Sequence, residues 1–176
     1  MLQIIIVRTY DPRQGGFTHR HTCDLELTGR LLLWTLRHGS RALRQRRDLP
    51  HFVRHTLIQL PAGTRLLELG EHLLAQLTLG ASRPLKFACP ESRSLTCDEN
   101  ALIMALVAAQ LGLTSDVRLL LADLQHGGGL RRAQRACLAL AATLEQYDLP
   151  LSRIATKHAP TFVFKHDQQA TVRASI

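Results

Sequence analysis

Hydrophobic residues recur at intervals of three and four along most of the chain, the spacing that predicts amphipathic helices. The first predicted helix covers residues 24–46, with a stripe of Leu25, Gly29, Leu32, Leu36, Gly39 and Leu43. Glycine weakens a helix by about 1 kcal/mol relative to alanine. Two glycines on this stripe therefore predict that the helix lies close to another one.

The same spacing predicts two further helices before the middle of the chain. One follows Pro50 and has an apolar side made of Phe52, Val53, Leu57 and Leu60. The next covers residues 64–77 and buries Leu66, Leu69, Leu73 and Leu77. Residues 78–95 contain glycine and prolines without a periodic pattern, so they predict an irregular segment.

The strongest helix-start signal is Thr96-Cys97-Asp98-Glu99. It fits the capping box, in which the threonine and glutamate side chains bond to backbone N–H groups of the first turn. Asp98 adds negative charge where the helix dipole favours it. No polar residue occurs between Ala101 and Ala109. A helix that is apolar on all sides is buried, so this one is predicted to be central.

Two more helices complete the predicted core. One covers residues 115–125, and the last ends near Tyr147 with a stripe of Leu130, Ala133, Cys137, Leu140, Leu144 and Tyr147. Between them, His126-Gly127-Gly128-Gly129 predicts an interruption. The pattern therefore predicts a mainly all-α fold, a single-domain bundle of five to six helices.

The two ends of the chain have a different pattern. Residues 2–8 are rich in branched side chains and predict a β-strand, and residues 161–164 predict a second short one. A small two-strand pair between them is one option. A length of 176 residues suits one domain. We expect a single helical domain over 1–176, with a strand and loop arm (1–23), a helical core (24–150) and a tail (151–176).

The sequence also bears on the cellular compartment. No apolar run approaches the roughly 20 residues that span a bilayer, and the N-terminus lacks the pattern of a signal peptide. In an unsecreted chain the four cysteines are expected to be free thiols. We therefore expect a cytoplasmic protein that does not bind membranes.

Residues 89–150 resemble a known family. They contain Cys89-Pro90, then Leu95-Thr96-Cys97-Asp98-Glu99-Asn100-Ala101-Leu102, then Arg118-Leu119-Leu120-Leu121-Ala122-Asp123-Leu124, and then an Ala/Leu helix that ends near a proline. This order is similar to an uncharacterised family of small bacterial helical proteins. The family has no assigned activity, so the resemblance implies an all-helical fold and transfers no site residue.

The charge balance points towards an acidic partner. The formal net charge is +8, and all but three of the 22 basic residues are arginine. Arginine pairs with carboxylates and phosphates through a forked guanidinium group. Abundant arginine, alanine and leucine also arise from a G+C-rich coding sequence, so composition alone does not decide between these explanations.

Two groups of residues are candidate anion-binding sites. The first contains Arg37, Arg41, Arg44, Arg46, Arg47 and Arg54, of which the first three share a helix face. The second contains Gly127, Gly128, Gly129, Arg131, Arg132 and Arg135. Unpaired N–H groups at a helix start attract anions, and an anion would relieve the repulsion between these arginines and the dipole. The alternative for both groups is an ordinary solvated surface.

These observations predict a non-enzymatic regulatory or accessory protein that binds an acidic protein partner through an arginine-rich surface. The alternative is a nucleic-acid-binding protein that contacts phosphates. A second alternative is a metal- or haem-binding protein, with His19, His21 and Cys23 as metal candidates and Cys89-Pro90 as a haem-type dipeptide. No catalytic residue and no cofactor are predicted, because the common nucleophile, phosphate-loop and zinc-protease motifs do not occur.

Overall fold

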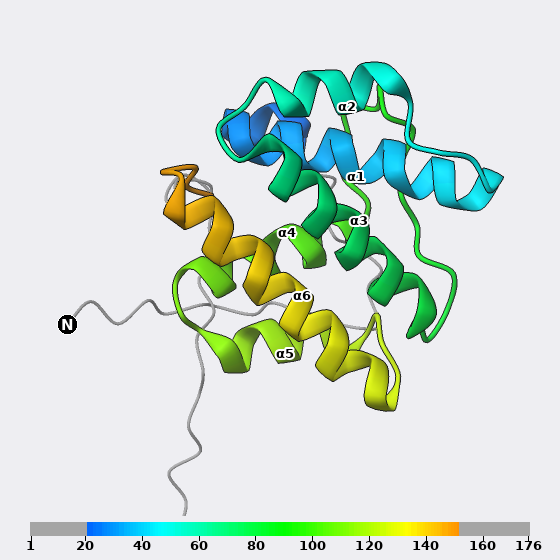
Figure 1. Cartoon of the computed structure of the whole chain (residues 1–176). Helices are drawn as coiled ribbons and strands as arrows, with labels where there is room; N and C mark the ends of the chain where they lie inside the picture. The colour runs from blue at the N-terminus through cyan, green and yellow to red at the C-terminus, as the bar shows by residue number, and fades with distance from the viewer. Residues whose placement is uncertain (1–20, 152–176) are drawn as a thin grey trace, which may run out of the picture.

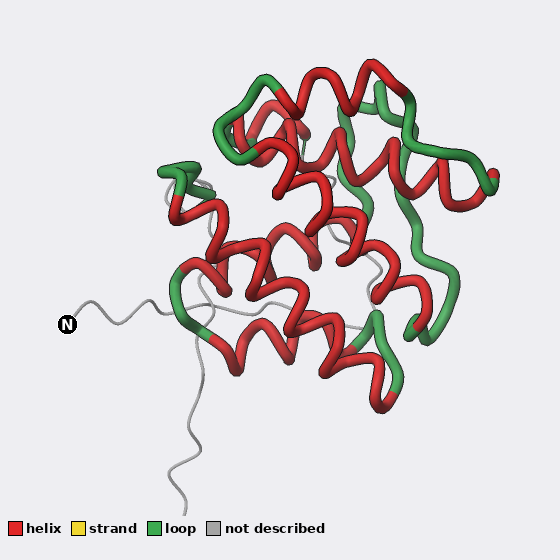
Figure 2. Tube along the Cα trace, viewed as in Figure 1, coloured by secondary structure: helices red, strands yellow, loops and turns green. Residues whose placement is uncertain are grey.

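The computed structural model describes residues 21–151, which form a bundle of six α-helices (Figures 1 and 2). A short 3-10 turn at Thr22–Asp24 comes first. The helices are α1 (Leu27–Gln45), α2 (His51–Ile58), α3 (Gly63–Leu79), α4 (Cys97–Gln110), α5 (Thr114–Ala122) and α6 (Gly127–Gln146). No strand occurs within residues 21–151, so the predicted all-α fold is confirmed. The two predicted strand segments, 2–8 and 161–164, lie outside the described residues.

The central position predicted for the apolar helix is confirmed. α4 packs against α1, α5 and α6, and its buried apolar residues are Leu102, Ile103, Ala105, Leu106, Val107 and Ala108. α3 lies between α6 on one side and the α1 and α2 pair on the other (Figure 1). A second, smaller apolar cluster of Leu49, Val53, Leu57 and Leu67 attaches α2 to α3.

The close helix contact predicted from the glycines of the first stripe is present. A Cβ atom added to Gly39 would lie 2.6 Å from Cδ1 of Leu74 on α3. Gly29 is buried as well. A larger side chain at position 39 would therefore require the end of the Leu74 side chain to shift.

The predicted capping box begins α4. The Thr96 hydroxyl accepts a hydrogen bond from the Glu99 N–H at 3.1 Å, and the Glu99 carboxylate accepts one from the Thr96 N–H at 2.9 Å. The segment before it, residues 80–96, contains no helix, as predicted (Figure 2). Arg83 forms two hydrogen bonds, of 2.5 and 2.8 Å, with the carboxylate of Asp98. We call residues 80–96 the α3–α4 segment.

The prediction of an interruption at Gly127–Gly129 is wrong, because these glycines form the first turn of α6. Glycines allow the backbone at the start of α6 to cross close to the backbone at the end of α3. A Cβ atom on Gly129 would lie 2.7 Å from the Cα atom of Gly80 at the end of α3, and the His126 N–H donates to the Gly80 carbonyl at 2.9 Å. Gly127 has a φ of +45°, which glycine adopts readily.

The sequence predicts Phe52 on the apolar side of its helix, but 53% of its surface is exposed to solvent. Among the helices within residues 21–151, none combines the length and hydrophobicity that crossing a bilayer requires.

Candidate functional site

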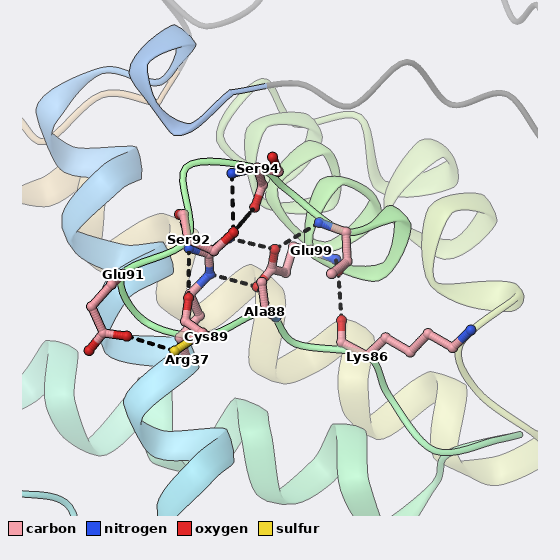
Figure 3. Close-up of polar contacts among 9 residues, drawn as sticks. Arg37, Lys86, Ala88, Cys89, Glu91, Ser92, Ser94 and Glu99 are labelled. Carbon is pink, nitrogen blue, oxygen red and sulfur yellow. Dashed lines mark hydrogen bonds and ion pairs between the residues drawn. The ribbon is translucent and has the colours of Figure 1, made fainter.

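Arg37 does not belong to an exposed arginine surface, which corrects the prediction for this residue. It is 2% exposed, and its guanidinium group forms a bidentate ion pair with Glu99, which is fully buried. The Nε–Oε1 distance is 2.7 Å and the Nη2–Oε2 distance is 2.9 Å (Figure 3). Arg37 is therefore neutralised inside the protein and is not part of an exposed arginine surface.

The Arg37–Glu99 pair holds the α3–α4 segment against α1. Arg37 also donates to the backbone carbonyls of Ser92 at 2.6 Å, Ser94 at 2.7 Å and Cys89 at 3.3 Å. Glu99 in turn accepts a hydrogen bond from the Ala88 N–H at 2.9 Å. Figure 3 shows the Arg37 side chain surrounded by this segment. One ion pair thus connects α1, the α3–α4 segment and the start of α4.

The other arginines near the end of α1 are exposed. Arg41 and Arg44 lie on the last turns of the helix, Arg46 has a left-handed φ of +52° that ends it, and Arg47 follows. No carboxylate within residues 21–151 forms an ion pair with any of the four. We call Arg41, Arg44, Arg46 and Arg47 the α1 arginine cluster. Arg54 differs from them, because it pairs with Glu71 of α3 at 2.9 Å.

A hollow of about 370 Å³ lies between the α1 arginine cluster and the α3–α4 segment. Its lining residues are Arg41, Arg44, Gln45, Phe87, Ala88, Cys89 and Pro90. Beside it, the Cys89 thiol donates a hydrogen bond to the Glu91 carboxylate at 2.6 Å. This hydrogen bond is the main reason why the pKa of Glu91 is below its ordinary value. The hollow therefore has two cations on one wall and an ionised carboxylate close to the other.

Aromatic rings pack around His38, which lies three residues before Arg41 on α1. His38 lies edge-on to Trp34 and Phe52, with ring centroids 4.8 and 5.2 Å apart. Burial lowers the pKa of His38, an effect that the Glu91 carboxylate opposes and the Arg41 cation reinforces. Trp34 is partly buried against the smaller apolar cluster. These rings stabilise the contact between α1 and α2.

The second candidate group lies at the start of α6. Arg131, Arg132 and Arg135 are all exposed and have no ion pair with a carboxylate of the described chain. Because the glycines belong to the helix, these arginines begin in its second turn, where the effect of the dipole is weaker than in the first. The physical reason for an anion at this helix start is therefore weaker than the sequence indicated.

Of the three metal candidates, the structure describes two. His19 lies outside the described residues, while His21 and Cys23 are exposed, and the backbone of His21 forms an isolated bridge with Ser94. Within residues 21–151 there is no group of three or more His, Cys, Asp or Glu side chains with the geometry to hold a metal ion. Cys89, the haem candidate, is exposed, and its thiol contacts Glu91.

Sequence reasoning missed the segment that completes the site. Arg37, Arg41 and Arg44 share a helix face, and nothing in their spacing indicates which of them is covered. The usable signal was Leu33 and Leu36 beside Arg37, since both leucines are buried and place position 37 near the core. Comparisons with protein-family models, curated proteins and solved structures found no match for this chain.

Proposed function

We propose that this protein is a non-enzymatic regulatory or accessory protein that binds an acidic protein partner through the α1 arginine cluster. One observation carries the proposal: four exposed arginines without ion pairs within residues 21–151 gather at the end of one helix, beside a hollow. Guanidinium groups bind carboxylates through two parallel hydrogen bonds. A surface of this kind therefore suits a partner that is rich in aspartate and glutamate.

The helix dipole explains the positions of only some arginines of the α1 arginine cluster. Cations in the last turn of a helix are stabilised by about 0.3–1 kcal/mol each, and the effect is small beyond that turn. Arg44 and Arg46 lie at the end of α1 and gain from the dipole. Arg41 lies one turn earlier, gains little from the dipole, and lines the hollow together with Arg44. Its position supports a role in binding.

The test measures binding of a fluorescein-labelled, glutamate-rich peptide by fluorescence polarisation. The variant R41Q/R44Q removes two charges from the cluster, and R30Q/R118Q removes two exposed charges elsewhere as a matched control. We expect R41Q/R44Q to weaken binding about tenfold, since two ion pairs of about 0.7 kcal/mol each sum to 1.4 kcal/mol. The control is expected to bind as the unmodified protein does.

Two results would contradict the proposal. The first is equal loss of affinity in R41Q/R44Q and R30Q/R118Q, because net charge and not the cluster would then determine binding. The second is tighter binding of single-stranded DNA or RNA than of a peptide with the same charge. That result, with a steep dependence of affinity on salt, would favour the nucleic-acid alternative.

A further inference from the structure

The hollow beside the α1 arginine cluster has two chemically different walls. α1 contributes the polar wall, made of Arg41, Arg44 and Gln45. The α3–α4 segment contributes a wall made of Phe87, Ala88, Cys89 and Pro90. Phe87 is partly buried against the main core, and Pro90 is buried. A ligand that fills this hollow would therefore contact cations on one side and apolar atoms on the other.

Both walls are fixed before any ligand binds. The Ala88 N–H donates to the buried carboxylate of Glu99, and the Cys89 carbonyl accepts from Arg37. The opposite wall belongs to a helix of 19 residues. A site that is formed in advance loses less conformational entropy on binding, which favours affinity.

The size and charge of the hollow limit what it accepts. A volume of 370 Å³ lies at the lower end of the range of about 300–1,000 Å³ for small-molecule sites. It suits one side chain better than a large cofactor. The Glu91 carboxylate is held beside the apolar wall by the Cys89 thiol. This negative charge disfavours a dianionic phosphate more than a singly charged carboxylate.

We infer that the hollow takes one apolar side chain of an acidic peptide segment, while carboxylates next to it in the segment pair with Arg41 and Arg44. The inference rests on the proposed function and names the chemistry of the partner. The partner would present a linear segment in which an apolar residue is flanked by aspartate or glutamate. Charge complementarity comes from the two arginines, and selectivity for the apolar residue comes from Phe87, Ala88 and Pro90.

The experiment compares two labelled peptides of equal charge, one with a phenylalanine between glutamates and one with serine in its place. We expect the phenylalanine peptide to bind the unmodified protein about tenfold more tightly, because part of the ring leaves water. The variant A88F fills the hollow and should reduce this preference to less than twofold. Should A88F fail to fold, Q45W on the exposed rim provides the same test.

The outcomes separate this inference from the proposed function. If both peptides bind equally and R41Q/R44Q weakens both, the proposed function stands and the inference is wrong. If the phenylalanine preference persists in both A88F and Q45W, the apolar subsite lies elsewhere and the inference is overturned. If neither peptide binds, both proposals fail. A peptide with phosphoserine in place of one glutamate that binds more tightly would overturn the assignment to carboxylates.

Discussion

Replacing Glu99 by glutamine removes one charge from the buried ion pair and keeps the shape of the side chain. Arg37 would then carry an uncompensated charge at 2% exposure. The glutamine amide would also direct N–H groups at a site where four hydrogen-bond donors now converge: Nε and Nη2 of Arg37, and the N–H groups of Ala88 and Thr96. Removing one partner of a buried pair costs about 3–5 kcal/mol, and we expect E99Q to lose this much stability.

The neighbouring carboxylate provides a matched control. Asp98 is also buried and pairs with an arginine, but the side chain of Arg83 is 44% exposed and water can solvate its charge. D98N should therefore cost clearly less than E99Q, although the two substitutions are adjacent and of the same type. The double variant R37M/E99L should not recover the stability, because the pair also satisfies the backbone carbonyls of Ser92 and Ser94.

Urea unfolding followed by circular dichroism measures the difference. With a slope of about 2 kcal/mol per molar urea, a loss of 3–5 kcal/mol lowers the midpoint by about 1.5–2.5 M. The reasoning would be refuted if E99Q lost less than about 1 kcal/mol, or if D98N lost as much as E99Q. The first result would mean that the Arg37–Glu99 pair does not hold the α3–α4 segment in place, and the second that the exposure of Arg83 does not lower the cost of losing its partner.

Three further predictions follow from single residues. G128A should raise the melting temperature, because no atom obstructs a Cβ at position 128 and alanine stabilises a helix by up to about 1 kcal/mol relative to glycine. G129A should lower the melting temperature, because its Cβ would meet Gly80. Burial keeps the pKa of His38 in the folded protein below its value in the unfolded chain, so the unfolded chain takes up the proton first as the pH falls. Stability should therefore decrease as the pH drops below about 6.5. H38Q should reduce this decrease, which urea midpoints measured at several pH values would show. Ellman's reagent should modify three thiols of the native protein and spare Cys137, which is buried and has a pKa raised to about 12.

The helices could be predicted because each depends on a short stretch of sequence. The apolar run from Ala101 to Ala109 requires burial on all sides, and Thr96 and Glu99 begin that helix through bonds to their own first turn. The glycines at 127–129 were misassigned for the opposite reason. Gly129 meets Gly80, some 50 residues earlier in the chain, and only this crossing of the two backbones explains why glycine is needed at position 129.

The sequence could not predict which arginines of the candidate site are covered, because this depends on the α3–α4 segment, which has no periodic pattern. Arg37, Arg41 and Arg44 are equivalent by spacing, yet the α3–α4 segment covers the first and leaves the other two open. The capping glutamate makes this division, since the carboxylate that begins α4 also binds Arg37 and places Ala88 opposite the open arginines. Arg37, which the sequence analysis assigns to the binding surface, thus holds one wall of the hollow instead, and the proposed binding rests on the two arginines that line the opposite wall.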